Sequence, residues 1–124
     1  MSDARITLGK RGEDLACREL ERRGYAIVAR RFRVRGGEID VISRDGPVLV
    51  FVEVKTRTGR RFGWAAEAVT AAKQRRIARL AHEYLLRHRL SDCPCRFDVV
   101  SVDVGASPPA VEIIQGAFDV ASPV

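Results

Sequence analysis

The sequence has no long apolar run, which excludes a membrane-spanning helix, because such a helix needs about 20 consecutive apolar residues. It also lacks the apolar core of a signal peptide near its start, since Met1–Arg5 leads directly into polar sequence. Internal repeats, low-complexity tracts and linkers are missing as well. We therefore expect a cytoplasmic protein with no membrane partner, made of a single domain over residues 1–120 and a short C-terminal tail over residues 121–124.

Cysteine and histidine are scarce, which argues against a disulfide framework and against a zinc site. The 3 cysteines are odd in number, and Cys93-Pro94-Cys95 has neither zinc-finger spacing nor partner histidines. The 2 histidines, His82 and His88, have no third ligand or nucleophile near them in the sequence. We expect reduced thiols and surface histidines.

Acidic residues are outnumbered by basic ones, with 16 Asp and Glu against 22 Lys and Arg, which gives a formal net charge of +6. A basic excess favours a polyanionic partner, and nucleic acid is the simplest one. The basic residues cluster around the segments discussed next, as Arg30, Arg31, Arg33 and Arg35, as Arg57, Arg60 and Arg61, and as Lys73, Arg75, Arg76 and Arg79. Such clusters suit contacts with phosphates and show no sign of base readout.

Two opposite charges interrupt a strand-like apolar run. Glu53-Val54-Lys55 follows the run Val48–Val52, and side chains alternate between the faces of a strand, so Glu53 and Lys55 share one face with apolar neighbours. Burying an unpaired charge in such a place costs on the order of several kcal/mol. Such charges are therefore usually paired with each other, bound to a metal ion or required for function. An ordinary ion pair on a half-solvated strand is the alternative interpretation.

A β-hairpin is predicted to bring further carboxylates to this face. The segment 38–43 also alternates, and Asp45-Gly46 is a turn signal between the two strand-like runs. With Asp45 and Gly46 at the centre of the turn, Asp40 lies opposite Phe51, and Glu38 lies opposite Glu53. A shift of one residue would send Asp40 to the other face.

Carboxylates at this range repel one another unless a proton or a cation lies between them. Mg²⁺ or Mn²⁺ is the expected ion, because Mg²⁺ takes oxygen ligands and binds through one or two carboxylates plus water and phosphate oxygens. The Lys55 ammonium beside such an ion would orient water and offset charge on a phosphate transition state. The constellation therefore suits phosphodiester hydrolysis.

The remaining pattern predicts an α/β fold. A helix is expected from Leu8 to Arg23, before Gly24, and a second helix from the N-cap Thr70 to about His88. Further strands are expected over residues 25–34, 96–102 and 110–114. Together with the hairpin they would form a central mixed β-sheet flanked by helices.

These residues resemble a known family. Asp40 followed by Glu53-Val54-Lys55 looks like the core of the PD-(D/E)xK nuclease superfamily, which has a restriction-endonuclease-like fold. A closer similarity, to the YraN-like family of bacterial proteins, rests on four blocks in order: Lys10–Ala16, Gly37–Asp40, Val50–Arg57, and Phe62-Gly63 through Val69-Thr70 to Lys73-Gln74. No proline precedes Asp40, where the superfamily label would place one.

The resemblance implies roles for individual residues. Asp40 and Glu53 would be metal ligands, Glu13 an additional acidic ligand from the first helix, and Lys55 the catalytic lysine. From spacing alone, Glu13 is equally well explained as a solvated glutamate that pairs with Lys10. Glu38 is predicted to support the site. The residues predicted to contact substrate phosphate are Arg57, Lys73 and Gln74.

The expected function is a metal-dependent nuclease, resolvase-like in its preference for nucleic-acid structure, with DNA favoured over RNA as the partner. The resemblance to resolvases also implies a homodimer. The alternative is a noncatalytic nucleic-acid-binding module or adaptor on a nuclease scaffold, and the presence of all four signature acidic and lysine residues weighs against it.

Overall fold

The structure is a computed structural model that describes residues 3–58 and 69–119. Its elements are α1 (Asp3–Arg22), β1 (Ala26–Val34), β2 (Gly37–Asp45), β3 (Val48–Arg57), α2 (Ala71–Arg87), β4 (Cys95–Asp103) and β5 (Ala110–Ile114). The strands form one sheet in the order β1-β2-β3-β4-β5. Among the strands of residues 3–58 and 69–119, only the β3–β4 pair is parallel, so the sheet is mixed, as predicted.

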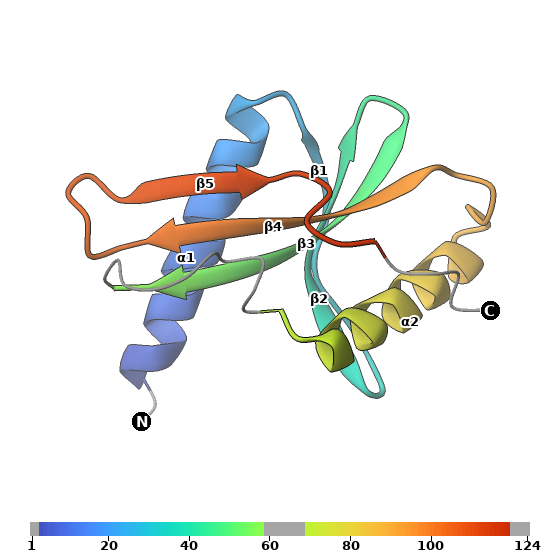
Figure 1. Ribbon diagram of the computed structural model, residues 1–124, viewed down its shortest axis with the longest axis horizontal. Coiled ribbons are helices and arrows are strands. Elements are labelled where there is room, and N and C mark those ends of the chain that lie inside the picture. The colour runs from blue at the N-terminus through green and yellow to red at the C-terminus, as the bar shows by residue number, and fades with distance from the viewer. Residues whose placement is uncertain (1–2, 59–68, 120–124) are drawn as a thin grey trace.

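The two helices cover opposite faces of the sheet (Figure 1). On one face, Ala16 and Leu20 of α1 pack against Val50 and Val52 of β3. On the other face, Leu80, Ala81 and Tyr84 of α2 pack against a group that includes Leu49 and Phe51. The predicted fold class, a mixed sheet flanked by helices, is confirmed.

The helix α2 lies in the connection between the parallel strands β3 and β4, which is where a helix is normally required to return the chain. The hydroxyl of Thr70 accepts a hydrogen bond from the Lys73 amide at 3.2 Å and caps the helix, as the sequence predicts. This cap fixes the start of α2 next to the middle of the sheet.

The hairpin register predicted from the sequence is wrong by two residues. Asp45 pairs with Val48 and Val41 with Val52, so the turn is centred on Gly46 and Pro47, with Gly46 at φ +62°. Pro47 has no amide donor for the ladder and is therefore better placed within the turn. A shift of two residues is an even number and does not by itself move a side chain to the other face, so Glu53 still lies on the face of Leu49 and Phe51, as strand alternation from those residues requires.

In the part of the chain that the structure describes, no helix is long and apolar enough to cross a membrane. The segment 60–64, with Arg60, Arg61, Phe62 and Gly63, and the predicted tail over residues 121–124 lie outside the described residues.

Candidate functional site

The candidate site lies where β2 and β3 separate. Their ladder ends at the pair Val41–Val52, and beyond it the Asp40 carboxylate takes over the role of a backbone acceptor. Its Oδ2 atom accepts a hydrogen bond from the Val54 amide at 2.8 Å. The side chain is therefore held at the fork between the two strands, at a fixed position along β3.

The alternation of β2 breaks at this same residue. Ile39 packs in the α2 cluster, whereas Val41, two positions on, packs in the α1 cluster. Across the sheet, Arg31 is missing from the ladder at the level of Asp40 and has a φ of 56°. A positive φ is costly for a residue with a side chain, and such strain is often found at functional sites.

The irregularity at Arg31 turns two successive arginines toward one carboxylate. Arg30 Nη2 lies 2.7 Å from Glu13 Oε1, and Arg31 Nε lies 3.3 Å from the same atom. In a regular strand, neighbouring side chains would point to opposite faces. Glu13, which is only 6% exposed, is thereby neutralised by β1 and held beside the fork.

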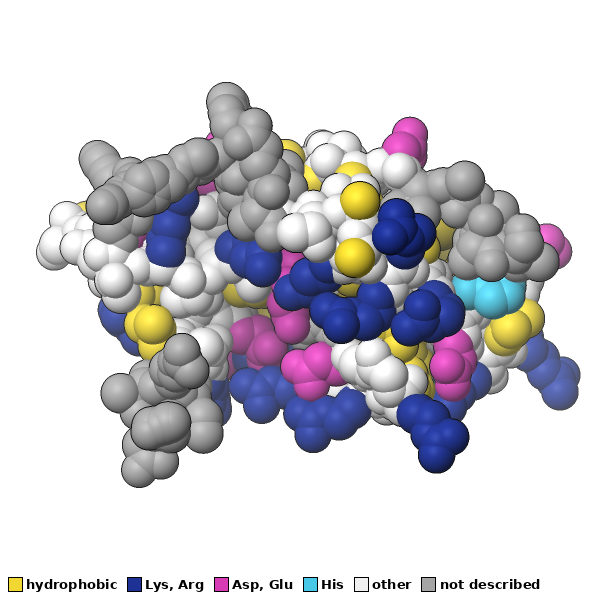
Figure 2. Space-filling view, turned by 60° about the horizontal axis from the view of Figure 1, so that its bottom comes forward, with side chains coloured by type: hydrophobic (Ala, Val, Ile, Leu, Met, Phe, Trp, Pro, Cys, Tyr) yellow, Lys and Arg dark blue, Asp and Glu magenta, His cyan; other side chains and the backbone are white. Residues whose placement is uncertain are grey.

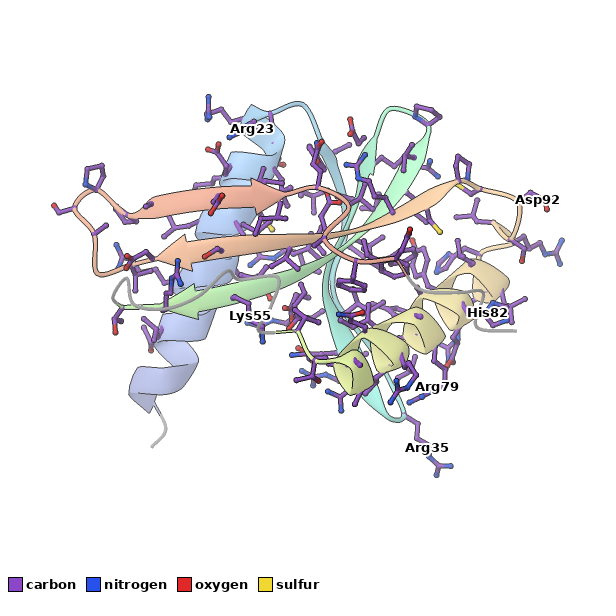
Figure 3. All side chains as sticks on the ribbon, in the orientation of Figure 1. Arg23, Arg35, Lys55, Arg79, His82 and Asp92 are labelled. Atoms are coloured by element: carbon purple, nitrogen blue, oxygen red, sulfur yellow. The ribbon has the colours of Figure 1, made fainter. Side chains whose placement is uncertain are left out.

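Glu53 is the buried carboxylate on the α2 side of the fork. It is 6% exposed, and its Oε2 atom lies 2.5 Å from Nζ of Lys73 and 3.6 Å from Nζ of Lys55. Lys73 comes from the first turn of α2, whereas Lys55 comes from the same strand as Glu53 (Figure 3 labels Lys55). The predicted Glu53–Lys55 pair is present, and α2 adds a second ammonium to it.

Burial raises the pKa of Asp40 to about 7, and the nearby charge of Glu53 pushes it in the same direction. The Val54 amide and the Lys73 ammonium lower this pKa, but they do not offset the burial. Burial lowers the pKa of Lys73, while the hydrogen bond and charge of Glu53 outweigh it, so the net shift is upward. The Lys73 ammonium thus interacts favourably with both carboxylates, whereas the two carboxylates repel each other.

Two hollows meet at Asp40 and Glu38, which line both of them. The hollow on the α1 side has a volume of about 330 Å³ and includes Glu13 and Arg31; the hollow on the α2 side has about 300 Å³ and includes Glu53 and Lys73. Solvent ions and ligands can therefore approach Asp40 from both sides of the fork.

The donor set suits a hard divalent cation bound by two carboxylates. Asp40 and Glu53 could supply oxygen ligands, and a cation between them would offset both the burial and the repulsion by Glu53 that raise the Asp40 pKa. Within residues 3–58 and 69–119, however, no group of three or more His, Cys, Asp or Glu side chains is close enough to hold a metal ion. Glu13 is instead bound by two arginines, and its role as a third ligand stays a prediction.

Of the other predicted site residues, the structure brings Glu38 and Lys73 to the site and binds Gln74 to the backbone. Glu38 pairs with Arg33 at 2.9 Å while it lines both hollows. Gln74 donates through Nε2 to the Val69 carbonyl at 3.0 Å, which binds it to the start of α2. Lys73, predicted to contact substrate, lies on Glu53 and so belongs to the carboxylate site itself.

Arg57 lies at the far end of β3, opposite Asp103 in the β3–β4 register. It lines a separate hollow of about 560 Å³ with Ser101 and Glu112, and its buried Nε atom has no hydrogen-bond partner among the described residues. Neither of the hollows at Asp40 includes it.

Sequence reasoning missed the pairing of Arg30 and Arg31 with Glu13. Both arginines stand out in the sequence as part of a basic cluster, but strand alternation predicts that only one of them faces α1. The left-handed backbone of Arg31 has no signature in the sequence, because glycine is the residue expected there.

A sequence model described as "Uncharacterised protein family UPF0102" matches residues 12–102 of the chain. A UPF0102 protein of Symbiobacterium thermophilum is 56% identical over 112 residues, which cover 90% of this chain and 95% of that protein. A UPF0102 protein of Geobacter metallireducens is 48% identical over 115 residues, covering 93% of this chain and 94% of the relative.

Among solved structures, Pyrococcus furiosus SfsA in complex with Ca²⁺ matches with a TM-score of 0.39 at 16% identity. The match covers 91% of this chain and 62% of that chain, and it is too loose to establish a shared fold.

Proposed function

This chain belongs to the UPF0102 family, and from the carboxylates and ammonium groups that meet at the β2–β3 fork we propose that it is a divalent-metal-dependent nuclease. Membership in this family, the YraN-like family, is what the sequence motifs predicted. The proposed reaction is hydrolysis of a nucleic-acid phosphodiester bond, with a resolvase-like preference for DNA structure.

One observation carries the proposal: Asp40 is fixed by the Val54 amide beside a buried Glu53 whose charge raises the Asp40 pKa. Simple structural packing does not require a buried aspartate to be held beside a second carboxylate at a cost to its charged form. A bound cation and a substrate phosphate would turn this cost into binding free energy. Asp40 and Glu53 would hold Mg²⁺ or Mn²⁺, which would polarise the phosphate and activate water.

The chain's own groups supply the rest of the chemistry. Lys55, whose Nζ lies 3.6 Å from Glu53, would orient the attacking water and stabilise charge on the phosphate oxygens. Lys73 balances the charge of Glu53 before substrate binds, and it is positioned to move onto a phosphate oxygen when a cation takes its place. Glu38 borders the same space and would help to order water.

The experiment is cleavage of a panel of labelled substrates by the purified protein, with and without Mn²⁺ or Mg²⁺. The panel contains duplex, single-stranded, flap and four-way-junction DNA and an RNA duplex. We expect metal-dependent cleavage of at least one DNA substrate, and a loss of about 100-fold or more in Asp40→Asn and in Lys55→Ala. Arg22→Ala is the control, because the exposed Arg22 pairs with Glu19 at the end of α1 at 2.7 Å and lines neither of the hollows at Asp40.

A second candidate is a noncatalytic nucleic-acid-binding module. The observation that favours it is the ion pairing of Glu53 with two ammonium groups, which neutralises this carboxylate without a metal. Under this alternative, every substrate in the panel stays intact with both metals, while nucleic acid still binds. Cleavage that is equal in the parent protein and in both variants would point to a contaminating nuclease and would contradict the proposal.

A further inference from the structure

A group of basic side chains on α2 and on the β1–β2 turn adjoins the candidate site. We define the α2–turn patch as Arg35, Arg76 and Arg79, all exposed to solvent. Arg76 lines the hollow that also contains Asp40 and Glu53, so the patch is continuous with the site. Figure 2 shows Lys and Arg side chains gathered across this face of the molecule, with acidic side chains among them.

The side chains of Arg76 and Arg79 lie beside the two glycines of the β1–β2 turn. Atoms of the Arg76 side chain lie 3.6 and 3.9 Å from the place where a β-carbon on Gly37 would stand, and a guanidinium nitrogen of Arg79 lies 3.8 Å from the equivalent place at Gly36. The φ values are positive at both glycines, 100° at Gly36 and 148° at Gly37. Figure 3 shows Arg35 at the tip of the turn, with Arg79 on the adjoining side of α2.

The three arginines of the patch have no acidic partner among the described residues. Arg35, Arg76 and Arg79 form no ion pair and no side-chain hydrogen bond with any side chain in residues 3–58 and 69–119. On the α1 side of the fork the situation differs, because Arg30 and Arg31 are paired with Glu13, and Lys10 is paired with Asp14. Unpaired cations that repel one another cost stability unless a ligand uses them.

The spacing of the patch suits a row of phosphates. Lys73, Arg76 and Arg79 follow one another at intervals of three residues, which corresponds to a rise of about 4.5 Å per step along the helix. The row begins at the ammonium on Glu53 and leads away from it over the turn. Guanidinium groups bind phosphate oxygens with two parallel hydrogen bonds, which a flexible chain of lysines does not reproduce.

From these contacts we infer that the substrate's phosphate backbone enters the site from the α2 side and is bound by Arg76 and Arg79, with Arg35 at the outer end of the track. The inference deepens the proposed function and depends on it for the identity of the ligand as a nucleic acid. Recognition is through phosphates, so affinity is independent of base sequence and falls steeply with salt.

The test is the affinity of the full chain for a fluorescent DNA duplex of about 20 base pairs, measured by anisotropy in EDTA over a series of KCl concentrations. Binding without metal keeps this measurement independent of cleavage. The variant is Arg76→Gln/Arg79→Gln, and the matched control is Arg18→Gln/Arg89→Gln, which removes two exposed charges elsewhere, on α1 and after the end of α2. Scrambled duplexes should bind with the same affinity as the first one.

We expect the patch variant to lose at least about 10-fold in affinity at moderate salt, and the slope of log K against log [KCl] to fall by about 2, since each phosphate contact contributes about 0.9. The control should change neither quantity to this extent. Equal losses in both double variants would overturn the inference, because net charge alone would then explain binding. An unchanged affinity and slope in the patch variant would overturn it too.

Failure of this inference is distinguishable from failure of the proposed function. If the patch variant binds normally while the parent protein cleaves DNA, the chain is a nuclease whose substrate lies elsewhere. If the patch variant loses affinity while the parent protein cleaves nothing with either metal, the binding track stands and the catalytic proposal falls.

Discussion

Asp40 is held in a place where its charged form is unfavourable. Burial and the charge of Glu53 raise its pKa to about 7, while a single backbone hydrogen bond from Val54 opposes them. An aspartate with a raised pKa stabilises the fold fully below its ordinary pKa of 3.8 and loses this contribution as the pH rises through the folded-state pKa. The parent protein should therefore lose stability between about pH 4 and pH 8 because of this residue.

The variant Asp40→Asn removes this pH dependence. Its side-chain oxygen can still accept from Val54, but it carries no charge at any pH. We expect the free energy of unfolding of Asp40→Asn, relative to that of the parent, to rise by about 2 kcal/mol between pH 4 and pH 8. Urea denaturation at several pH values measures the difference.

The same experiment with saturating Mg²⁺ provides the control, because a cation that binds the charged carboxylate should stabilise only the parent protein, and more so at high pH. Curves for the two proteins that stay parallel from pH 4 to pH 8 in EDTA would show that the Asp40 carboxyl is not perturbed by the fold, contrary to the burial and charge described above.

For single residues, the sequence is informative about chemistry and less so about partners. The alternation of the apolar run is enough to place Glu53 and Lys55 on one face, and the structure joins them in an ion pair. The contact of Lys73 with Glu53 depends on how α2 packs across the sheet, which no local pattern contains. Conversely, Gln74 is a plausible phosphate ligand by its type, but it is hydrogen-bonded to the backbone of Val69.

Among the elements, α1 approaches β3 closely at Gly12. A β-carbon on this residue would meet the side chain of Thr56, with 2.8 Å to its Cγ2 and 2.9 Å to its Cβ. Distances this short require the helix or the strand to move. Since Glu13 follows Gly12 and borders the hollow that Thr56 also lines, the close approach sets how near the Glu13 carboxylate lies to the fork.

We expect Gly12→Ala to lower the free energy of unfolding by about 2 kcal/mol, although alanine is the better helix former. Gly9→Ala is the matched control on the same helix, because a β-carbon there meets nothing within 4 Å. It should stabilise the protein by about 0.5 to 1 kcal/mol. Chemical denaturation of the two variants and the parent protein measures both changes in the free energy of unfolding.

The second control for Gly12→Ala is the combination with Thr56→Ala, which removes the methyl and hydroxyl groups in the path of the new β-carbon. The double variant should be less destabilised than the sum of the two single variants, with a coupling of about 1 kcal/mol. Additive effects would mean that the helix does not contact β3 through these two positions.

At the scale of elements, the sequence predicts the type and order of helices and strands better than their boundaries and strand register. Both helices and all five strands are in the predicted order, because their apolar periodicities differ clearly and Thr70 is a good N-cap. The start of α1 at Asp3 was missed, since its first turn has no apolar stripe. The hairpin register failed because Asp45-Gly46 and Gly46-Pro47 are both acceptable turn centres, and only the pairing across the sheet decides between them.

Across the whole molecule, two buried carboxylates lie on opposite faces of neighbouring strands. Glu53 is opposite Val99 in the β3–β4 register, and Asp98 is opposite Val52. Asp98 is 0% exposed and fully satisfied: it accepts from Arg96 Nε at 2.9 Å, from the Tyr25 hydroxyl at 3.0 Å and from the Gly116 amide at 3.0 Å. This network joins β4 to the start of β1 and to the segment after β5.

The surroundings of the two carboxylates predict opposite consequences of their removal. Asp98→Ala removes a fully buried carboxylate that accepts from Arg96, from the Tyr25 hydroxyl and from the Gly116 amide, so we expect the free energy of unfolding to fall by about 3 kcal/mol. Glu53→Gln removes a charge that Asp40 repels, and Lys73 can turn to solvent, so the change in stability should stay within about 1 kcal/mol.

Divalent metal separates the two roles in one experiment, in which thermal melts of both variants are recorded with and without saturating Mn²⁺. Asp98→Ala should melt at a lower temperature than the parent protein but keep the upward shift caused by metal, because its network lies on the other face of the sheet. Glu53→Gln should melt near the parent temperature and lose the shift. If Asp98→Ala abolished the metal shift while Glu53→Gln retained it, the metal would bind on the α1 face, and the assignment of the site to the β2–β3 fork would be wrong.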